Sequence, residues 1–137
     1  MTLTHEGLTV EWLGNASTRI EGEDVVVYID HGRFGVLSGE WTPPSEAARD
    51  AHPPARDYRP EDGDIVFVTH DDHYDPDGIE RVTRDDATVV VSEGIDVHAV
   101  DRTDVRPVDL PYDVRRVGVE TEGVAAGVPF WTVPAYN

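Results

Sequence analysis

Residues 64–76 read Asp-Ile-Val-Phe-Val-Thr-His-Asp-Asp-His-Tyr-Asp-Pro, and this stretch carries the strongest signal in the chain. A short apolar run ends at Thr69, and two histidines and three aspartates follow within the next six residues. This order is typical of a metal site at the end of a buried strand, where the strand fixes the backbone and the loop points its side chains at one spot. Imidazole nitrogen and carboxylate oxygen suit zinc, manganese or iron. The stretch therefore predicts a metal-binding loop.

Outward from this loop, the pattern alternates between strands and short helices. Ile65–Thr69 is predicted to be a buried strand, and Pro76–Val82 a short helix with Asp75 as its N-cap and Pro76 at its first position. Further strands are predicted at Leu8–Leu13, Ser17–Ile20, Val25–Asp30, Thr88–Ser92, Val114–Val119 and Val128–Val133. A second helix is predicted at Gly94–Arg102 and a loop at His31–Gly39. Turns are predicted at Gly14-Asn15, Gly123 and Gly127. The order strand, helix, strand, helix in the middle of the chain, with further strands on both sides, predicts a layered α/β domain with a mixed sheet.

Residues 41–63 form a proline-rich segment that interrupts this pattern, with five prolines in 23 residues. Ser45–Arg49 is predicted to form one helical turn that begins with Ser45 as its cap. The remainder is interpreted as a surface insertion, which serves either as a lid or partner contact or as an unstructured excursion.

Composition places the chain among single-domain proteins. It has 137 residues, of which 39% are hydrophobic, enough for a packed core. No apolar run is long enough to cross a bilayer, and the N-terminus lacks a basic segment followed by an apolar one, so a cytoplasmic protein is expected. There are no cysteines, so a metal would have to be bound by histidine and carboxylate.

Charge is strongly acidic, with 11 basic residues against 28 acidic residues and a net charge of −17. All the basic residues are Arg. Such a surface repels nucleic acid and anionic lipid, so neither is an expected partner. Two interpretations remain: an acidic interaction module, or a cytosolic protein from an organism with molar internal salt. The acids are scattered along the chain, which favours the halophile.

Three segments, in order, resemble a known family. They are similar to segments of metallo-β-lactamase-fold hydrolases, in the branch of L-ascorbate-6-phosphate lactonase-like proteins. The first segment is Trp12-Leu13-Gly14-Asn15-Ala16-Ser17 with Val27-Tyr28-Ile29-Asp30, the second is Asp64 to Pro76, and the third is Thr132 to Asn137. The charge is that of a haloarchaeal member. The resemblance implies the N-terminal half of a metallo-β-lactamase-like αββα sandwich, as a single domain over residues 1–137.

The family motif, His-x-His-x-Asp-His, is incomplete in this chain. Matching Asp72-His73 to its last two positions leaves the central histidine missing, whereas an ungapped reading puts Asp72 at the second histidine and Tyr74-Asp75 at the end. The first alignment is preferred because Tyr74-Asp75-Pro76 then falls where the next helix begins. The family's further ligands belong to its second half, which this sequence does not include.

The resemblance implies a metal-dependent hydrolase in which metal-bound hydroxide attacks a lactone, phosphoester or amide of a small-molecule substrate. His70, Asp72 and His73 would be the metal-site residues, with Asp72 as the catalytic residue that holds a metal or orients water. Asp30 would orient an imidazole. Zinc is expected, with manganese or iron as alternatives, and at most one ion per chain because one histidine is missing.

The alternative function is a non-catalytic scaffold of the same fold that serves as a binding or assembly module. In that case His70 and His73 are helix-entry residues bonded to the backbone. His31 is a weaker candidate for the site, and His5, His52 and His98 are given no role. Because half of a two-layer fold leaves a sheet face uncovered, the chain is expected to form a homo-oligomer or to pair with a missing C-terminal half.

Overall fold

The computed structural model describes residues 1–32, 35–51, 57–95 and 103–135. The described strands are β1 (Thr2–His5), β2 (Leu8–Gly14), β3 (Ser17–Glu21), β4 (Val26–Ile29), β5 (Gly63–Val68), β6 (Thr83–Ser92), β7 (Asp113–Val117), β8 (Glu122–Ala125) and β9 (Val128–Trp131). The described helices are α1 (Glu46–Ala51) and α2 (Pro76–Val82), with 3₁₀ turns at Asp71–His73 and Pro107–Asp109.

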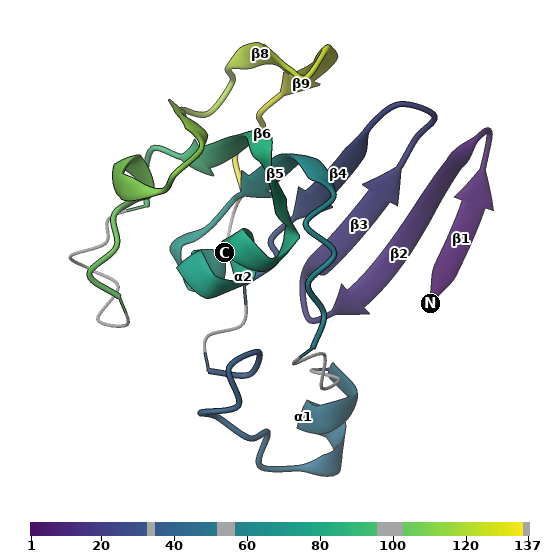
Figure 1. Ribbon diagram of the computed structural model, residues 1–137, viewed down its shortest axis with the longest axis vertical. Helices are drawn as coiled ribbons and strands as arrows, with labels where there is room; N and C mark the ends of the chain where they lie inside the picture. The colour runs from purple at the N-terminus through teal and green to yellow at the C-terminus, as the bar shows by residue number, and fades with distance from the viewer. Residues whose placement is uncertain (33–34, 52–56, 96–102, 136–137) are drawn as a thin grey trace.

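A seven-stranded mixed sheet forms the centre of the molecule (Figure 1). Its strands lie in sequence order, from β1 at one edge to β7 at the other. Neighbours from β1 to β4 are antiparallel, and neighbours from β4 to β7 are parallel. Strands β8 and β9 form a separate antiparallel hairpin. The parallel half therefore brings the carboxyl ends of β4, β5, β6 and β7 to one edge of the sheet.

One face of the central sheet packs against α2. Successive residues of a strand point to opposite faces, and Val66, Val68, Val89 and Val91 share a buried cluster with Ile79 of α2. All five are 2% exposed or less. Removing several side-chain carbons from such a site costs about 2–5 kcal/mol, so this cluster anchors the fold.

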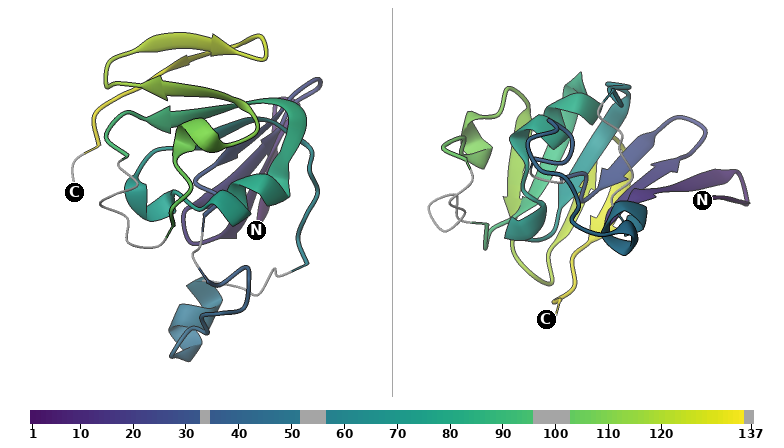
Figure 2. Two further views of the ribbon diagram at one scale, coloured as in Figure 1. Left: turned by 60° about the vertical axis from the view of Figure 1, so that its left-hand side comes forward. Right: turned by 90° about the horizontal axis from the view of Figure 1, so that it is seen from below.

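The opposite face packs against the β8–β9 hairpin. Ile65, Phe67 and Val90 share a second cluster with Ala125 of β8 and Phe130 of β9. Figure 2 shows α2 and the hairpin on opposite sides of the sheet. Helix, sheet and hairpin thus make three layers, and burial on both faces explains the apolar runs Ile65–Val68 of β5 and Val89–Val91 of β6.

Two of the three predicted helices are confirmed in place. Helix α2 spans Pro76–Val82, as its Asp75-Pro76 start predicts. Asp75 occupies the N-cap position, but it is buried and its side chain makes no capping hydrogen bond. Helix α1 lies within the proline-rich segment, and the Ala48 amide donates a hydrogen bond to Ser45 Oγ at 3.1 Å. The predicted serine cap is therefore present.

Two strands, β1 and β8, were not expected from the sequence, and the prediction of a turn at Gly123 is wrong. Gly123 lies inside β8 opposite Phe130, and a Cβ at this position would overlap the Phe130 ring. Strand β6 begins at Thr83, five residues before the predicted start, because Thr83 pairs with Gly63. The helix predicted at Gly94–Arg102 falls, beyond Ile95, outside the described residues.

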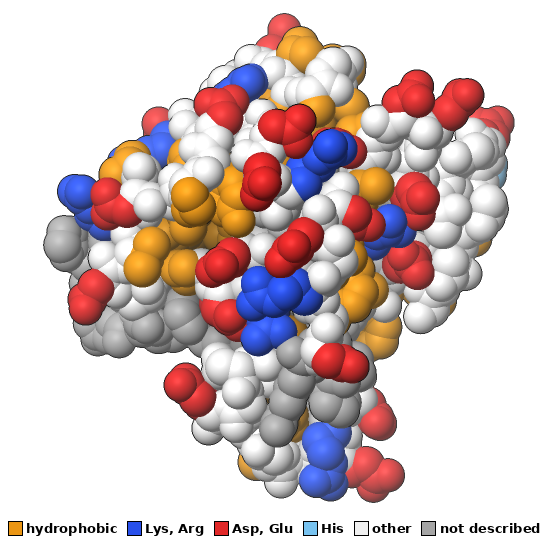
Figure 3. Space-filling model, viewed as in Figure 1, with side chains coloured by type: hydrophobic (Ala, Val, Ile, Leu, Met, Phe, Trp, Pro, Cys, Tyr) orange, Lys and Arg blue, Asp and Glu red, His pale blue; other side chains and the backbone are white. Residues whose placement is uncertain are grey.

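The chain is therefore a mixed α/β protein, as predicted at the level of fold class. Acidic side chains are spread over the whole face seen in Figure 3, with Arg side chains between them. Within the described ranges, no helix has the length and apolar character required to cross a membrane.

Candidate metal centre

The site lies where β4 and β5 end side by side. Parallel pairing aligns Ile29 with Phe67, and the Asp30 amide continues the pairing by donating to the Phe67 carbonyl at 2.9 Å. Asp30, the first residue after β4, therefore lies beside Thr69 and His70, the residues that follow β5. Asp30 has a φ of 52°, a left-handed conformation that Asp adopts more readily than most residues.

The Asp30 carboxylate holds the start of the β5 loop. It is 7% exposed, and it accepts hydrogen bonds from the Thr69 amide at 2.8 Å and from Thr69 Oγ1 at 2.7 Å. A buried carboxylate needs such donors, since an unpaired buried charge is costly. Two bonds to one residue fix the carboxylate plane and the direction in which the chain leaves the strand.

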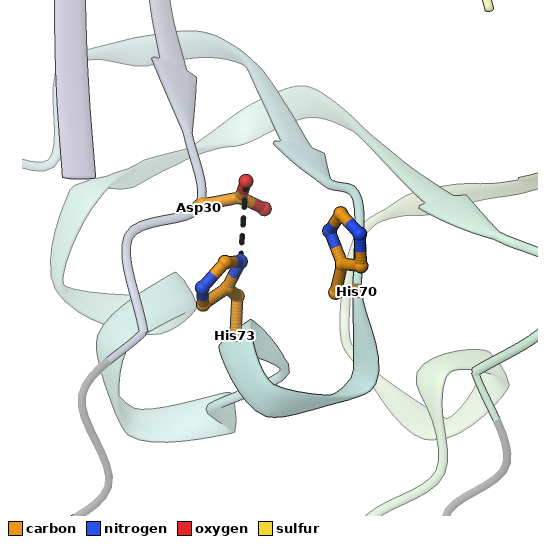
Figure 4. Close-up of side chains that lie close together, drawn as sticks. All are labelled: Asp30, His70 and His73. Atoms are coloured by element: carbon orange, nitrogen blue, oxygen red, sulfur yellow. Dashed lines mark ion pairs between the residues drawn. The ribbon is translucent and has the colours of Figure 1, made fainter. Parts of the chain in front are cut away.

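His73 faces the same carboxylate from the 3₁₀ turn (Figure 4). Its Nδ1 lies 3.2 Å from Asp30 Oδ2, and the side chain is 21% exposed. This nitrogen is buried, and no hydrogen bond of acceptable geometry reaches it from the described residues. The His70 and His73 ring centroids are 5.7 Å apart, at an interplanar angle of 76°. A buried ring nitrogen beside a carboxylate, without a directed hydrogen bond, suits a shared cation.

One ligand atom each from Asp30, His70 and His73 lies within 4.8 Å of the other two. Two imidazoles and one carboxylate form a donor set for zinc or iron, so the residues present fit the predicted metal. Of the predicted site residues, the structure brings His70 and His73 together and leaves Asp72 outside this group. Asp72 is exposed on the 3₁₀ turn. Asp30, predicted only to orient an imidazole, supplies the carboxylate of the group.

A chain of hydrogen bonds sets the tautomer of His70. Thr69 Oγ1 donates its single proton to Asp30 Oδ2, and the same oxygen lies 2.7 Å from His70 Nδ1. Because the hydroxyl proton is already used, Nδ1 must carry a proton and donate it to Thr69. The lone pair of His70 then resides on Nε2. Sequence reasoning missed this role of Thr69, although a hydroxyl next to a candidate ligand histidine was a usable signal.

Gly32 lets the loop after β4 lie against the 3₁₀ turn. A Cβ at Gly32 would overlap the backbone carbonyl of His73 and would lie 2.9 Å from the Asp75 Cβ. Gly78 of α2 likewise allows a close contact with this loop, because a Cβ at Gly78 would overlap the His31 carbonyl. These two close approaches fix the distance between the segment that carries Asp30 and the turn that carries His73.

His31 lies outside the metal group and belongs to a neighbouring buried cluster. It is 1% exposed, its Nδ1 is 2.5 Å from Ser17 Oγ, and its ring is 5.7 Å from the rings of Tyr28 and Tyr58. Among the remaining histidines, His5 is exposed on β1, while His52 and His98 lie outside the described residues. His5 therefore does not enter the site.

A polar network lies beside this cluster. The Tyr28 hydroxyl donates to Asp62 Oδ1 at 2.8 Å and lies 2.8 Å from the Tyr58 hydroxyl. Arg19 donates to Asp62 Oδ2 at 2.8 Å, completing the network. Burial raises the pKa of Tyr28 far above its usual value, with added contributions from Tyr58 and Asp62. The network therefore holds Tyr28 neutral and serves as a structural support for β4.

No protein-family model matches this chain, and searches of curated proteins and of solved structures likewise found no match. The assignment of a function therefore depends on the geometry of the site.

Proposed function

We propose that this protein is a metal-dependent hydrolase whose single metal ion is held by Asp30, His70 and His73. The observation that carries the proposal is the convergence of these three side chains at the carboxyl ends of β4 and β5. Ligands and substrates of open α/β sheets commonly bind at this edge. The buried Nδ1 of His73, 3.2 Å from Asp30 Oδ2, supports a cation between them.

Three protein ligands are the number found in catalytic zinc sites, which leave a position open for water or substrate. Zinc is the first choice, and manganese and iron are the alternatives, because the same two-histidine, one-carboxylate set also binds Fe(II). A metal ion here would supply a Lewis acid and lower the pKa of a bound water. The substrate class proposed from the family resemblance is a lactone, phosphoester or amide.

The three-layer arrangement of helix, sheet and hairpin supports assignment of the domain to the N-terminal half of a metallo-β-lactamase-like sandwich. That assignment is part of the proposal, as is a halophilic, cytoplasmic origin inferred from the net charge of −17. Association into a homo-oligomer also stays a prediction. Exposed apolar side chains at the hairpin end, including Trp131 and Val133 at 67% exposure each, favour it. Sedimentation in molar KCl measures it directly.

A non-catalytic scaffold remains the second candidate function, and one observation favours it. Asp72, the predicted catalytic residue, is exposed and lies outside the group that Asp30 forms with the two histidines. A site without that carboxylate could bind a metal for structural purposes alone. In this case the metal would stabilise the loop after β5 but would not accelerate hydrolysis.

The test begins with protein dialysed against a chelator and then against zinc, manganese or iron in molar KCl. Mass spectrometry should find one ion per chain in the wild type and none in His70→Ala or His73→Ala. His5→Ala, an exposed histidine on β1, is the matched control and should keep the ion. Hydrolysis of lactone, phosphoester and amide panels should depend on the added metal. A chain that binds no transition metal would eliminate the hydrolase and leave the scaffold.

A further inference from the structure

A cavity of about 520 Å³ opens beside the metal group, between the central sheet and the β9 end of the hairpin. Its floor is the sheet face opposite α2, formed by Ile29, Phe67, Val90 and Val117 from four successive parallel strands. This volume lies within the usual range for small-molecule sites, roughly 300–1,000 Å³.

The roof of the cavity comes from β9 and the segment that follows it. Phe130 packs against Phe67 of the floor, with ring centroids 5.3 Å apart and an interplanar angle of 74°. Trp131 and Val133 extend the roof outward and are both 67% exposed. Both walls are therefore apolar, and the aromatic pair joins them.

Few side chains of the lining are polar, and they differ in how far their hydrogen-bonding capacity is already used. Thr132 Oγ1 already donates to the Gly118 carbonyl at 2.7 Å and accepts from the Thr121 amide at 2.9 Å. Thr69 Oγ1 is engaged with Asp30 and His70. Ser92 Oγ accepts a hydrogen bond from the Gly94 amide at 3.4 Å. Of the polar side chains in the lining, the His70 ring is the one that also belongs to the metal group.

We propose that this cavity binds the apolar acyl or alkyl part of a neutral small molecule, with the ester, lactone or amide group of that molecule against His70. The inference rests on the proposed function and specifies its substrate class. A neutral ligand fits because the net charge of −17 disfavours anions and the described lining residues include no carboxylate to pair with a cation. An apolar chain fits because the floor and roof offer almost no hydrogen-bonding partners.

The binding test uses octanamide as a neutral probe and acetamide as its short counterpart, with chelator present so that no metal contributes. In ¹⁵N–¹H NMR spectra, octanamide should shift the amide signals of Phe67, Val90 and Val117 in a saturable way. Signals of Ile79 and Val82, in the cluster on the α2 side, should not move. Acetamide should shift none of them, because it lacks the chain that fills the cavity.

Two variants make the test specific. Val117→Phe places a larger side chain in the cavity and should weaken octanamide binding about tenfold or more. Val124→Phe makes the same change on β8, at a residue that is 57% exposed and outside this lining, and should leave binding unchanged. If Val117→Phe fails to fold, a nitroxide-labelled octanamide gives a second measurement. It should broaden the signals of floor residues selectively.

Failure of this inference is distinguishable from failure of the proposed function. Octanamide shifts without metal binding would keep the cavity and eliminate the hydrolase. One bound zinc with no octanamide shifts, or with shifts spread evenly over the protein, would overturn the cavity proposal and leave the metal site intact. Equal hydrolysis of acetyl and octanoyl esters by the zinc-loaded protein would also overturn it, because a chain that occupies the cavity must favour the longer substrate.

Discussion

Replacing Asp30 by Asn should reduce both stability and metal affinity, whereas the same change at Asp72 should reduce neither. The Asp30 carboxylate is 7% exposed, accepts hydrogen bonds of 2.8 and 2.7 Å from Thr69, and faces His73 Nδ1 at 3.2 Å. Asn has the same shape but only one acceptor oxygen. One of the two Thr69 donors would then face an amide NH₂ group.

The size of the effect follows from these contacts. A hydrogen bond to a charged group contributes about 1.5–3 kcal/mol, so Asp30→Asn should lower the free energy of unfolding by about 2 kcal/mol. For a domain of this length, that corresponds to a fall of roughly 6–10 °C in melting temperature. Zinc affinity should fall by more than about 100-fold, because losing a residue that only orients a ligand already costs 10–100-fold.

The assay compares wild type, Asp30→Asn and Asp72→Asn, which all keep the same side-chain volume. Thermal unfolding is followed by circular dichroism with chelator present, and zinc affinity is measured by competition with a chromophoric chelator. Asp72 is exposed, so its variant should unfold and bind zinc as the wild type does. If Asp72→Asn lost zinc while Asp30→Asn kept it, the carboxylate ligand would be Asp72, and the reasoning from the pairing of β4 with β5 would be refuted.

Three further predictions concern other parts of the structure. Thr69→Val should abolish the preference of His70 for the Nδ1-protonated tautomer, whereas Thr69→Ser should keep it. ¹⁵N NMR of the His70 ring measures the tautomer. An unchanged tautomer in Thr69→Val would contradict the hydrogen-bond chain. Because the pKa of Tyr28 is raised by burial, the folded chain keeps a proton that the unfolded chain loses above about pH 10. Stability should therefore fall with rising pH in that range, and Tyr28→Phe should lower it by about 1 kcal/mol at neutral pH and flatten the alkaline decline in denaturant titrations. Raising KCl from about 0.1 to about 1 M shortens the Debye length from about 10 to about 3 Å and should raise the melting temperature, because the net charge is −17; a flat or falling melting temperature would oppose the halophile interpretation.

Sequence reasoning located those elements whose signals are local. The Asp75-Pro76 start placed α2, and Ser45 placed the cap of α1. The unexpected strands β1 and β8 belong to hairpins closed by Glu6-Gly7 and Ala126-Gly127, in which both turn residues have positive φ. Such turns favour Asn or Asp before Gly. Glu6 in the first position gives no such signal for the hairpin of β1 and β2. The turn at Gly127 was predicted, and β8 was missed because Gly123, which lies inside this strand, was interpreted as a second turn.

The candidate site was partly predictable because its two histidines are close in sequence, while Asp30 lies 39 residues before Thr69. Parallel strands require a long connection, and nothing in the residues next to Asp30 specifies that β4 pairs with β5. The sequence showed only that each strand ends in a polar residue. The pairing of Ile29 with Phe67 then converts two separate strand ends into one site.

The spacing of the histidines also explains why Asp30, and not Asp72, joins them. Residues 71–73 form a 3₁₀ turn preceded by His70. With three residues per turn, positions i and i+3 lie above one another on the same side, whereas adjacent positions differ by about 120°. His70 and His73 therefore face inward together and Asp72 must point away from them, toward solvent. A His-x-x-His spacing on such a turn leaves the carboxylate to be supplied by another strand, and the end of β4 is the neighbouring segment that supplies it.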